Sequence, residues 1–425
     1  MRLVCGPDNF ALPDIVDAMR VILYGQPRED GQGSVGQAVR KTISRERFEC
    51  STRAWDLLSI ALSIITADFA GLRNQSPDGW TREFEIHIAV ADTQFWKGQA
   101  ESLASALAFL TTDRWILRFH KGGIQPIRPN KPVRPKEDCV VLLSGGLDSL
   151  VGAIDLAAAE YNPLAISQTV RGDADKQVKF AAHIGGGLGH LQLNHVAKIP
   201  GEKENSQRAR SFIFIAFGVL AATALQRYHD NDQVHLYVCE NGFMAINPPL
   251  TGRRLGSLST RTAHPEFLQR LQLVLDAAEL CVKIVNPYSL KTKGEMLREC
   301  KNQSLLKTLA IQSTSCSRFQ RFQYRHCGRC VPCQVRRAAL LGWTGNPDKT
   351  DYVYKQIGSD GADHSGFDDV RSVAVALATI RDEGIESWLR HAIISPLIGD
   401  RQKLHDMLKR GMAELENLHK KYEIT

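Results

Sequence analysis

Six consecutive residues could bind phosphate and hold a carboxylate beside it: Ser144-Gly145-Gly146-Leu147-Asp148-Ser149. They directly follow the apolar run Val140–Leu143, and an aliphatic helix is predicted to begin at Leu147. Glycines let main-chain N–H groups close on a phosphate, and the start of a helix adds partial positive charge. The lysine that follows the second glycine of a Walker loop is missing, so a different phosphate-binding loop is indicated. A glycine turn that binds nothing is the alternative.

Four cysteines form the second group with chemical potential: Cys316, Cys327, Cys330 and Cys333. Four thiolates on short loops can enclose Zn²⁺ tetrahedrally, and such a closed site is structural rather than catalytic. An iron–sulfur cluster and unconnected buried cysteines are the alternatives. The remaining cysteines are scattered and are predicted to fill the core: Cys5, Cys50, Cys139, Cys239, Cys281 and Cys300.

The elements that must position these residues follow an α/β pattern. Strands are predicted at 140–143, 163–168, 191–196, 234–239 and 281–285, and helices at 147–158, 178–184 and 211–227. This alternation is typical of a parallel sheet with helices on both faces. Phosphate-binding loops of such sheets lie at the carboxyl ends of strands, which is where Ser144 to Ser149 falls.

Regions on both sides extend this central unit of residues 139–343. Residues 1–123 predict a small N-terminal α/β region, with helices at 55–69 and 96–110 and strands at 83–91 and 115–119. Residues 124–138 predict a stiff, basic linker because prolines recur in them. Residues 344–425 predict a helical appendage for packing or for a partner, with helices at 370–380, 385–394 and 402–422.

Composition limits the functional classes. The chain has 425 residues, of which 43% are hydrophobic and 23% charged, as in soluble proteins of two or three domains. No apolar run reaches the ~18 residues that span a bilayer, and no signal peptide is visible, so a cytoplasmic location without a membrane partner is expected. The net charge of +7 suits a protein that handles ATP but does not require a nucleic-acid partner.

The strand–SGGxDS–helix arrangement resembles the ATP pyrophosphatases, which have an adenine nucleotide α-hydrolase-like (PP-loop) fold. Those enzymes split ATP between its α and β phosphates and adenylate a substrate. The loop and the later Cys-Gly-x-Cys-x-x-Cys-x-x-Arg segment, here Cys327 to Arg336, together resemble the 7-cyano-7-deazaguanine synthase (QueC) family. Two further segments agree with that family, Lys291–Glu295 after Pro287 and Arg208–Phe212.

The resemblance implies ATP, Mg²⁺ and Zn²⁺ as cofactors and suggests a role for each site residue. Ser144, Gly145, Gly146 and Ser149 would cradle phosphate, with Leu147 beginning the helix behind them. Asp148 would serve Mg²⁺ or the geometry of the loop, or be only a helix N-cap. Lys293 and Arg210 would neutralise the leaving pyrophosphate, or be surface charges. Glu295 could be only a helix N-terminal residue.

The chain departs from the synthases in the segments expected to bind the deazaguanine base, at Gln168–Asp173 and at Glu240–Thr251. With its added end regions it is similar to the synthase-like proteins of bacterial anti-phage defence operons, notably those of the Qat system. That likeness implies adenylation of a deazapurine acid, 7-carboxy-7-deazaguanine or a relative, and acyl transfer to an amine of a partner protein from the same operon. The alternatives are release of the free nitrile, a tRNA-modifying enzyme of the same loop class, and an ATP-binding scaffold.

Arginines crowd around the cysteine segment: Arg318, Arg321, Arg325, Arg329, Arg336 and Arg337. A solvated basic face is the default expectation for such a cluster. A site for ATP, RNA or an acidic partner is the alternative.

Overall fold

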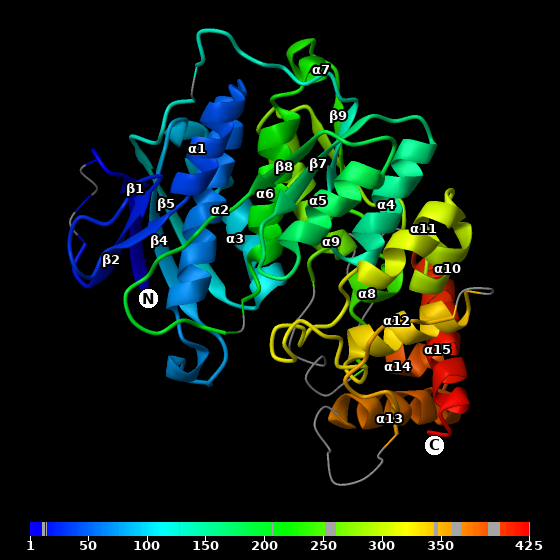
Figure 1. Cartoon of the computed structure of the whole chain (residues 1–425). Helices are drawn as coiled ribbons and strands as arrows, with labels where there is room; N and C mark the ends of the chain where they lie inside the picture. The colour runs from blue at the N-terminus through cyan, green and yellow to red at the C-terminus, as the bar shows by residue number, and fades with distance from the viewer. Residues whose placement is uncertain are drawn as a thin grey trace.

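The frame of the protein is a pair of parallel five-stranded sheets (Figure 1). The computed structural model describes residues 1–10, 13, 15–126, 128–205, 207–250, 261–343, 347–358, 367–389 and 400–424. The first sheet has the order β3-β2-β1-β4-β5, with β1 Arg2–Pro7, β2 Ala18–Leu23, β3 Gly33–Val35, β4 Glu83–Val90 and β5 Arg114–Lys121. The second has the order β10-β9-β6-β7-β8, with β6 Cys139–Leu142, β7 Pro163–Gln168, β8 His190–Leu193, β9 Val234–Tyr237 and β10 Val282–Val285.

Both sheets share one topology. Counted from the first strand of each sheet, the spatial order is 3-2-1-4-5 in both, which is compatible with a Rossmann-like fold. The prediction of a parallel sheet in the central unit is confirmed. The N-terminal region is larger than the predicted strand–helix–strand unit, because β1, β2 and β3 precede the elements recognised in the sequence.

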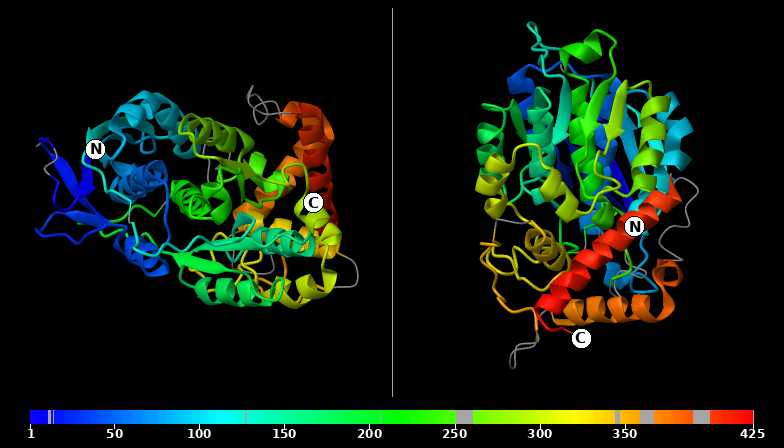
Figure 2. Two further views of the ribbon diagram at one scale, coloured as in Figure 1. Left: turned by 90° about the horizontal axis from the view of Figure 1, so that it is seen from above. Right: turned by 90° about the vertical axis from the view of Figure 1, so that its right-hand side faces the viewer.

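Helices form layers between and outside the sheets (Figure 2). The first half contains α1 Gln37–Glu46, α2 Thr52–Ala70, α3 Thr93–Thr111, α4 Leu147–Ala158, α5 Ala174–His183, α6 Arg210–Ala222 and α7 Gln226–His229. The second half contains α8 Gly242–Ile246, α9 Pro265–Ala277, α10 Lys293–Glu299, α11 Gln303–Leu309, α12 Val331–Leu341, α13 Phe367–Glu383, α14 Ile385–Leu389 and α15 Arg401–Lys421. Helix α2 packs on the first sheet and α6 on the second, and the two helices pack on each other.

Strand β6 shows why the second sheet needs helices on both faces. Its side chains alternate, so Val140 and Leu142 join the core that contains α6, whereas Cys139 and Val141 join the core that contains α4. The core that contains α6 also extends through α2 to the strands of the first sheet. One hydrophobic core therefore serves both sheets.

The predicted helix 211–227 is interrupted. Helix α6 ends at Ala222, and α7 begins at Gln226. The Thr223 hydroxyl donates to the Leu220 carbonyl over 2.8 Å and accepts from the Ser51 amide over 3.2 Å. Such side-chain bonds compete with the helical pattern of the backbone.

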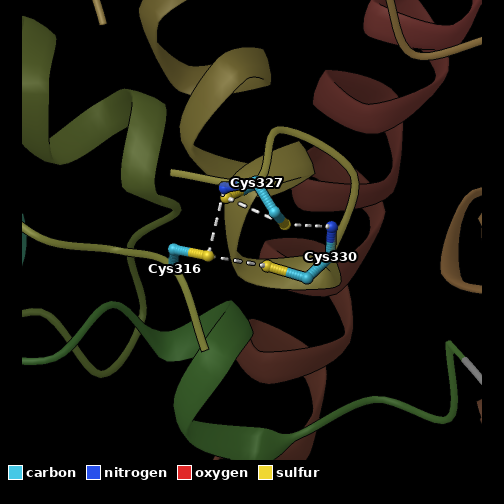
Figure 3. Close-up of side chains that lie close together, drawn as sticks. Cys316, Cys327 and Cys330 are labelled. Carbon is cyan, nitrogen blue, oxygen red and sulfur yellow. Dashed lines mark hydrogen bonds between the residues drawn. The ribbon is translucent and has the colours of Figure 1, made fainter. Parts of the chain in front are cut away.

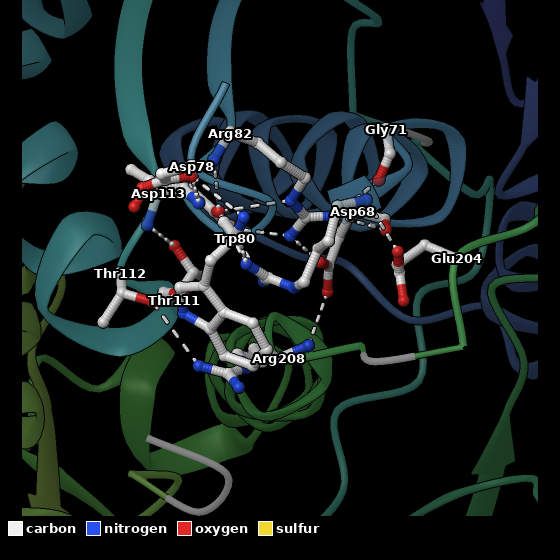
Figure 4. A network of polar contacts seen from close by, with 12 residues as sticks. Asp68, Gly71, Asp78, Trp80, Arg82, Thr111, Thr112, Asp113, Glu204 and Arg208 are labelled. Atoms are coloured by element: carbon white, nitrogen blue, oxygen red, sulfur yellow. Dashed lines mark hydrogen bonds and ion pairs between the residues drawn. The ribbon is translucent and has the colours of Figure 1, made fainter. Parts of the chain in front are cut away.

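A buried network of charges joins the two sheets at the start of α6 (Figure 4). The Asp68 carboxylate, at the end of α2, accepts from the backbone amides of Arg208 and Ala209 over 2.7 and 2.8 Å. It also pairs with Arg82, which in turn pairs with Asp113. The side chains of Asp68 and Asp113 are 0% exposed and that of Arg82 is 3% exposed, so the network is shielded from water.

We expect Asp68→Asn to lower the free energy of unfolding by about 3–5 kcal/mol, because it leaves the buried Arg82 with reduced compensation. The measurement is urea denaturation followed by circular dichroism. The matched control is Glu83→Gln, since Glu83 is 68% exposed in its pair with Arg114 and such pairs contribute about 0–1 kcal/mol. Equal effects of the two substitutions would contradict a stabilising role for the network.

The C-terminal helices pack against the central unit. The predictions of helices at 370–380 and 402–422 are confirmed by α13 and α15; of the predicted helix 385–394, α14 covers Ile385–Leu389 and residues 390–394 lie outside the described residues. Helix α15 contacts α12 and α8. Residues 122–126 and 128–138 of the proline-rich connection contain no helix or strand. None of the helices that the structure describes is both long enough and apolar enough to cross a membrane.

Candidate functional site

The Ser144–Ser149 loop connects β6 to α4 and is held by its own hydroxyl groups. The Ser149 hydroxyl accepts from the Ser144 amide over 3.1 Å and donates to the Gly146 carbonyl over 3.0 Å. Gly145 has a φ of 87°, a conformation that favours glycine, and a Cβ there would lie 3.2 Å from the Cβ of Asp173. The turn and the packing of Asp173 therefore favour glycine at this position.

Asp148 is buried in the first turn of α4, whose N-cap is Gly146, so Asp148 is not an N-cap. One carboxylate oxygen pairs with the Lys293 ammonium, and the other accepts from the Asn241 amide and side chain over 3.2 and 2.6 Å. Burial acts to raise the pKa of Asp148, but Lys293 and Asn241 outweigh it and lower the pKa. These partners favour the second predicted role, which is to fix the geometry of the loop.

Lys293 reaches Asp148 from the start of α10. Thr292 caps this helix in a capping box with Glu295, so Glu295 is a helix N-terminal residue, as one reading of the sequence had it. The Lys293 side chain is 8% exposed. The sequence prediction that Lys293 belongs with the loop therefore agrees with the geometry, although Lys293 is 145 residues away from Asp148.

A cavity of about 320 Å³ opens in front of the loop, at the carboxyl ends of β6 and β9. The loop, α10, β9 and the segment before the cysteines contribute the residues that matter here: Ser144, Gly146, Asp148, Ser149, Glu240, Lys293, Thr314 and Cys316. The Thr314 amide donates to the Gly145 carbonyl over 2.9 Å, so the segment leading to Cys316 lies directly on the loop. The volume of the cavity is at the lower end of the range for ligand-binding pockets.

Arg210 lies outside this set. It is the first residue of α6, it is exposed, and it does not line the cavity. Its charge acts on Asp173, the residue that packs against Gly145. His195 lies near it, and burial together with the Arg210 charge lowers the pKa of His195 to about 4, so that imidazole is neutral at pH 7. The predicted role of Arg210 stays a prediction.

The four predicted cysteines converge, and Figure 3 shows three of them, Cys316, Cys327 and Cys330. All four sulfurs lie within 4.8 Å of one another, and the pairs Cys327–Cys333 and Cys316–Cys330 are each 3.9 Å apart. Zinc–sulfur bonds of about 2.3 Å in a tetrahedron require sulfur separations of about 3.8 Å, so the residues fit zinc. The amides of Cys327 and Cys330 each donate to a cluster sulfur over 3.3 Å. Hydrogen bonds with Cys316 and the other thiols lower the pKa of Cys327.

The other cysteines do not join this cluster. Cys5, Cys50, Cys139, Cys239 and Cys300 are buried, as predicted for core residues. Cys281 is exposed, and the prediction that it fills the core is wrong. It directly precedes β10, at the edge of the second sheet.

The prediction of a solvated basic face is wrong for Arg329, Arg336 and Arg337, which are 3%, 0% and 4% exposed. The Arg336 guanidinium donates to the Ser313 hydroxyl and the Ala310 carbonyl over 2.9 Å each. Arg337 lies 3.8 Å from the centre of the Tyr352 ring. Helix α12 turns Arg336 and Arg337 toward its packed side. Arg329 precedes the helix and donates to the Gly358 carbonyl over 2.7 Å. These arginines therefore hold the segments around the cysteines together.

Glu240 and Asn241 were not singled out as site residues. They lie three and four residues after the carboxyl end of β9. Ligands of parallel sheets usually bind at such ends, so this position was a signal that the sequence offered. Burial and the Asp148 charge raise the pKa of Glu240 to about 8. Its carboxyl group is therefore largely protonated at pH 7, beside an ionised Asp148.

We expect this group to make stability depend on pH. The pKa of Glu240 is about 8 in the folded chain and ordinarily 4.5. The contribution of protonated Glu240 to the free energy of unfolding is therefore complete below pH 4.5 and is lost as the pH rises toward 8. Glu240→Gln should reduce this loss. The measurement is urea unfolding of both proteins at several pH values between about 5 and 8.5. Glu101→Gln, at an exposed position, is the control, and identical pH profiles for wild type and Glu240→Gln would contradict the shift.

Comparisons with known proteins assign no family: no family model, no curated protein and no solved structure matches the chain.

Proposed function

We propose that the protein is an ATP-dependent enzyme that adenylates 7-carboxy-7-deazaguanine, or a related deazapurine acid, and transfers the acyl group to an amine of a partner protein in anti-phage defence. The observation that carries the ATP part is that the Ser144–Ser149 loop, Lys293 and the cysteine segment line one cavity together. The identity of the acid and of the amine comes from the resemblance of the two motifs and of the added end regions.

The chemistry requires charge neutralisation more than acid–base side chains. A carboxylate oxygen of the substrate attacks the α-phosphorus of ATP, the bond to the β-phosphate breaks, and pyrophosphate leaves. The amine nitrogen then attacks the acyl carbon, AMP leaves with the electron pair of the broken bond, and the nitrogen loses a proton. In this scheme Lys293, which lines the cavity, would neutralise the growing charge on pyrophosphate, and the loop would hold it.

Magnesium would enter with the nucleotide. No group of three or more His, Cys, Asp or Glu side chains other than the cysteine cluster is positioned to hold a metal ion among the described residues. Mg²⁺ commonly binds through substrate phosphates and one or two carboxylates, and it shields phosphate charge during transfer. Asp148 and Glu240 are carboxyl groups that line the cavity and could contact Mg²⁺.

Zinc would have a different task. Its four thiolate ligands leave no open position, so it would act on structure. Cys316 lines the cavity, and Thr314 two residues earlier bonds to the loop. Zinc would therefore fix the wall of the cavity that faces the loop.

The test is incubation of the purified protein with ATP, Mg²⁺ and 7-carboxy-7-deazaguanine, with and without the proteins encoded beside it. Mass spectrometry should detect AMP and a mass increase on a partner protein, and Asp148→Ala should abolish both. If the free nitrile forms and no protein gains mass, the acyl group is not transferred to a partner protein, and the alternative of nitrile release holds instead. Dependence of AMP formation on tRNA would favour the tRNA-modifying alternative, and ATP binding without AMP formation would favour a scaffold.

A further inference from the structure

One face of α15 lies against both segments that hold Asp148. Met407, Arg410, Gly411 and Glu414 are spaced by three, one and three residues, so they share one side of the helix. Figure 1 shows α15, the last helix of the chain, beside α10. The two segments are Leu290–Glu295, which carries Lys293, and Asn241–Phe243, which carries Asn241.

The first contact surrounds Lys293. The Glu414 carboxylate accepts from the Thr292 hydroxyl over 2.6 Å and from the Gly294 amide over 3.3 Å, so it bonds to the residues on either side of Lys293. Its side chain is 16% exposed. A Cβ at Gly294 would lie 2.2 Å from a Glu414 oxygen, so the glycine is required for this approach.

Arg410 strengthens the same contact one turn away. Its guanidinium bonds to the Glu295 carboxylate over 2.5 Å and to the Leu290 carbonyl over 3.0 Å. Glu295 belongs to the capping box of α10. Two charged residues of α15 therefore hold the six residues from Leu290 to Glu295 at both ends.

The second contact surrounds Asn241. Phe243 of α8 packs so closely on Gly411 that a Cβ there would lie 2.2 Å from the ring. A Cβ at Gly242 would lie 3.0 Å from the Met407 methyl carbon. Asn241 caps α8 and donates two hydrogen bonds to Asp148. The helix thus lies against the segments that carry both partners of the Asp148 carboxylate.

We propose that α15 is a built-in part of the nucleotide site and that Glu414 is a positioning residue for Lys293. The inference rests on the proposed function, and it assigns the C-terminal helix to catalysis rather than to a partner surface. Glu414 touches no substrate in this scheme. It fixes the start of α10, and so the position of the ammonium that neutralises pyrophosphate.

The test compares Glu414→Ala and Glu414→Gln with Glu416→Ala. Glu416 is the matched control because it lies on the same helix and pairs with the exposed Lys420. We expect Glu414→Ala to lower kcat for pyrophosphate release by about 10- to 100-fold with KM for ATP changed by less than about 3-fold, since small displacements of a catalytic group are costly. Glu414→Gln, which keeps an acceptor for Thr292, should recover part of kcat.

A double variant separates positioning from general destabilisation. In a Lys293→Met background, Glu414→Ala should cause no further loss of kcat, because the group that it positions is already absent. Independent losses that multiply would overturn the proposal, as would equal effects of Glu414→Ala and Glu416→Ala.

Hydrogen exchange provides a readout that does not need turnover. The Gly294 amide should exchange at least about 10-fold faster in Glu414→Ala than in wild type, and Glu416→Ala should leave it unchanged. If wild type forms no AMP but this difference is seen, the proposed function fails and the placement of α10 by Glu414 stands. If AMP forms and the exchange rate is unchanged, the positioning proposal fails alone.

Discussion

Replacement of Lys293 by methionine is expected to reduce pyrophosphate release by about 10²–10³-fold, the effect of removing one preorganised group from a developing charge. The substitution keeps the length and the apolar stem of the side chain and removes its charge. Because Asp148 then stays buried without its cation, the free energy of unfolding should also fall by about 3–5 kcal/mol. Initial rates and urea denaturation measure the two effects separately.

A second substitution distinguishes these effects. Lys293→Met combined with Asp148→Asn removes the unpaired charge, so stability should recover while activity stays low. The control is Lys291→Met, since Lys291 is two residues away and pairs with Glu299 at the surface. Recovery of activity in the combined variant would show that Lys293 acts on folding alone.

Replacement of Cys330, a member of the four-cysteine cluster, is expected to prevent folding before it affects catalysis. Binding of structural zinc contributes about 10–16 kcal/mol to the folding of small zinc domains, and the Cys330 side chain is 0% exposed. Cys330→Ala should lower the yield of folded protein and the zinc content, measured by elemental analysis. Removal of zinc from wild type with a chelator should expose the same region to proteases.

Cys300→Ala is the matched control, because Cys300 is also buried but stands apart from the cluster. It should keep one zinc ion per chain and fold normally. A Cys330→Ala protein that folds fully and loses only catalysis would contradict a structural metal. Iron in place of zinc, together with absorption of visible light, would establish an iron–sulfur cluster.

Local patterns predicted the parts of the site that lie close together in sequence. The two glycines after Val140–Leu143 require a turn, and three cysteines within seven residues require a compact loop, so both signals are local. The strands of the second sheet were also predicted, because β6 is buried on both faces and forms a continuous apolar run, whereas residues of β8 alternate between buried and half-buried. The first sheet was recognised only in part, since Gly33–Val35 has just three residues and Arg2–Pro7 has no helix directly after it.

Partners distant in sequence could not be predicted in this way. The contact of Glu414 with Gly294 joins residues 120 apart, and nothing in either segment names the other. The arginines after Cys327 were misread for a related reason. Charge density in a sequence says nothing of whether carbonyls and hydroxyls, such as those of Ala310 and Ser313, will surround a guanidinium after folding.

The packing of α2 on α6 has a consequence for how the chain melts. Residues 52–70 pack on the first sheet and residues 210–222 on the second, and the two helices bury apolar side chains against each other. Neither sheet can lose its structure without exposing the helix that covers its neighbour. Heating should therefore give one cooperative heat-absorption peak for both halves, and a cut in the proline-rich connection should leave the two pieces associated.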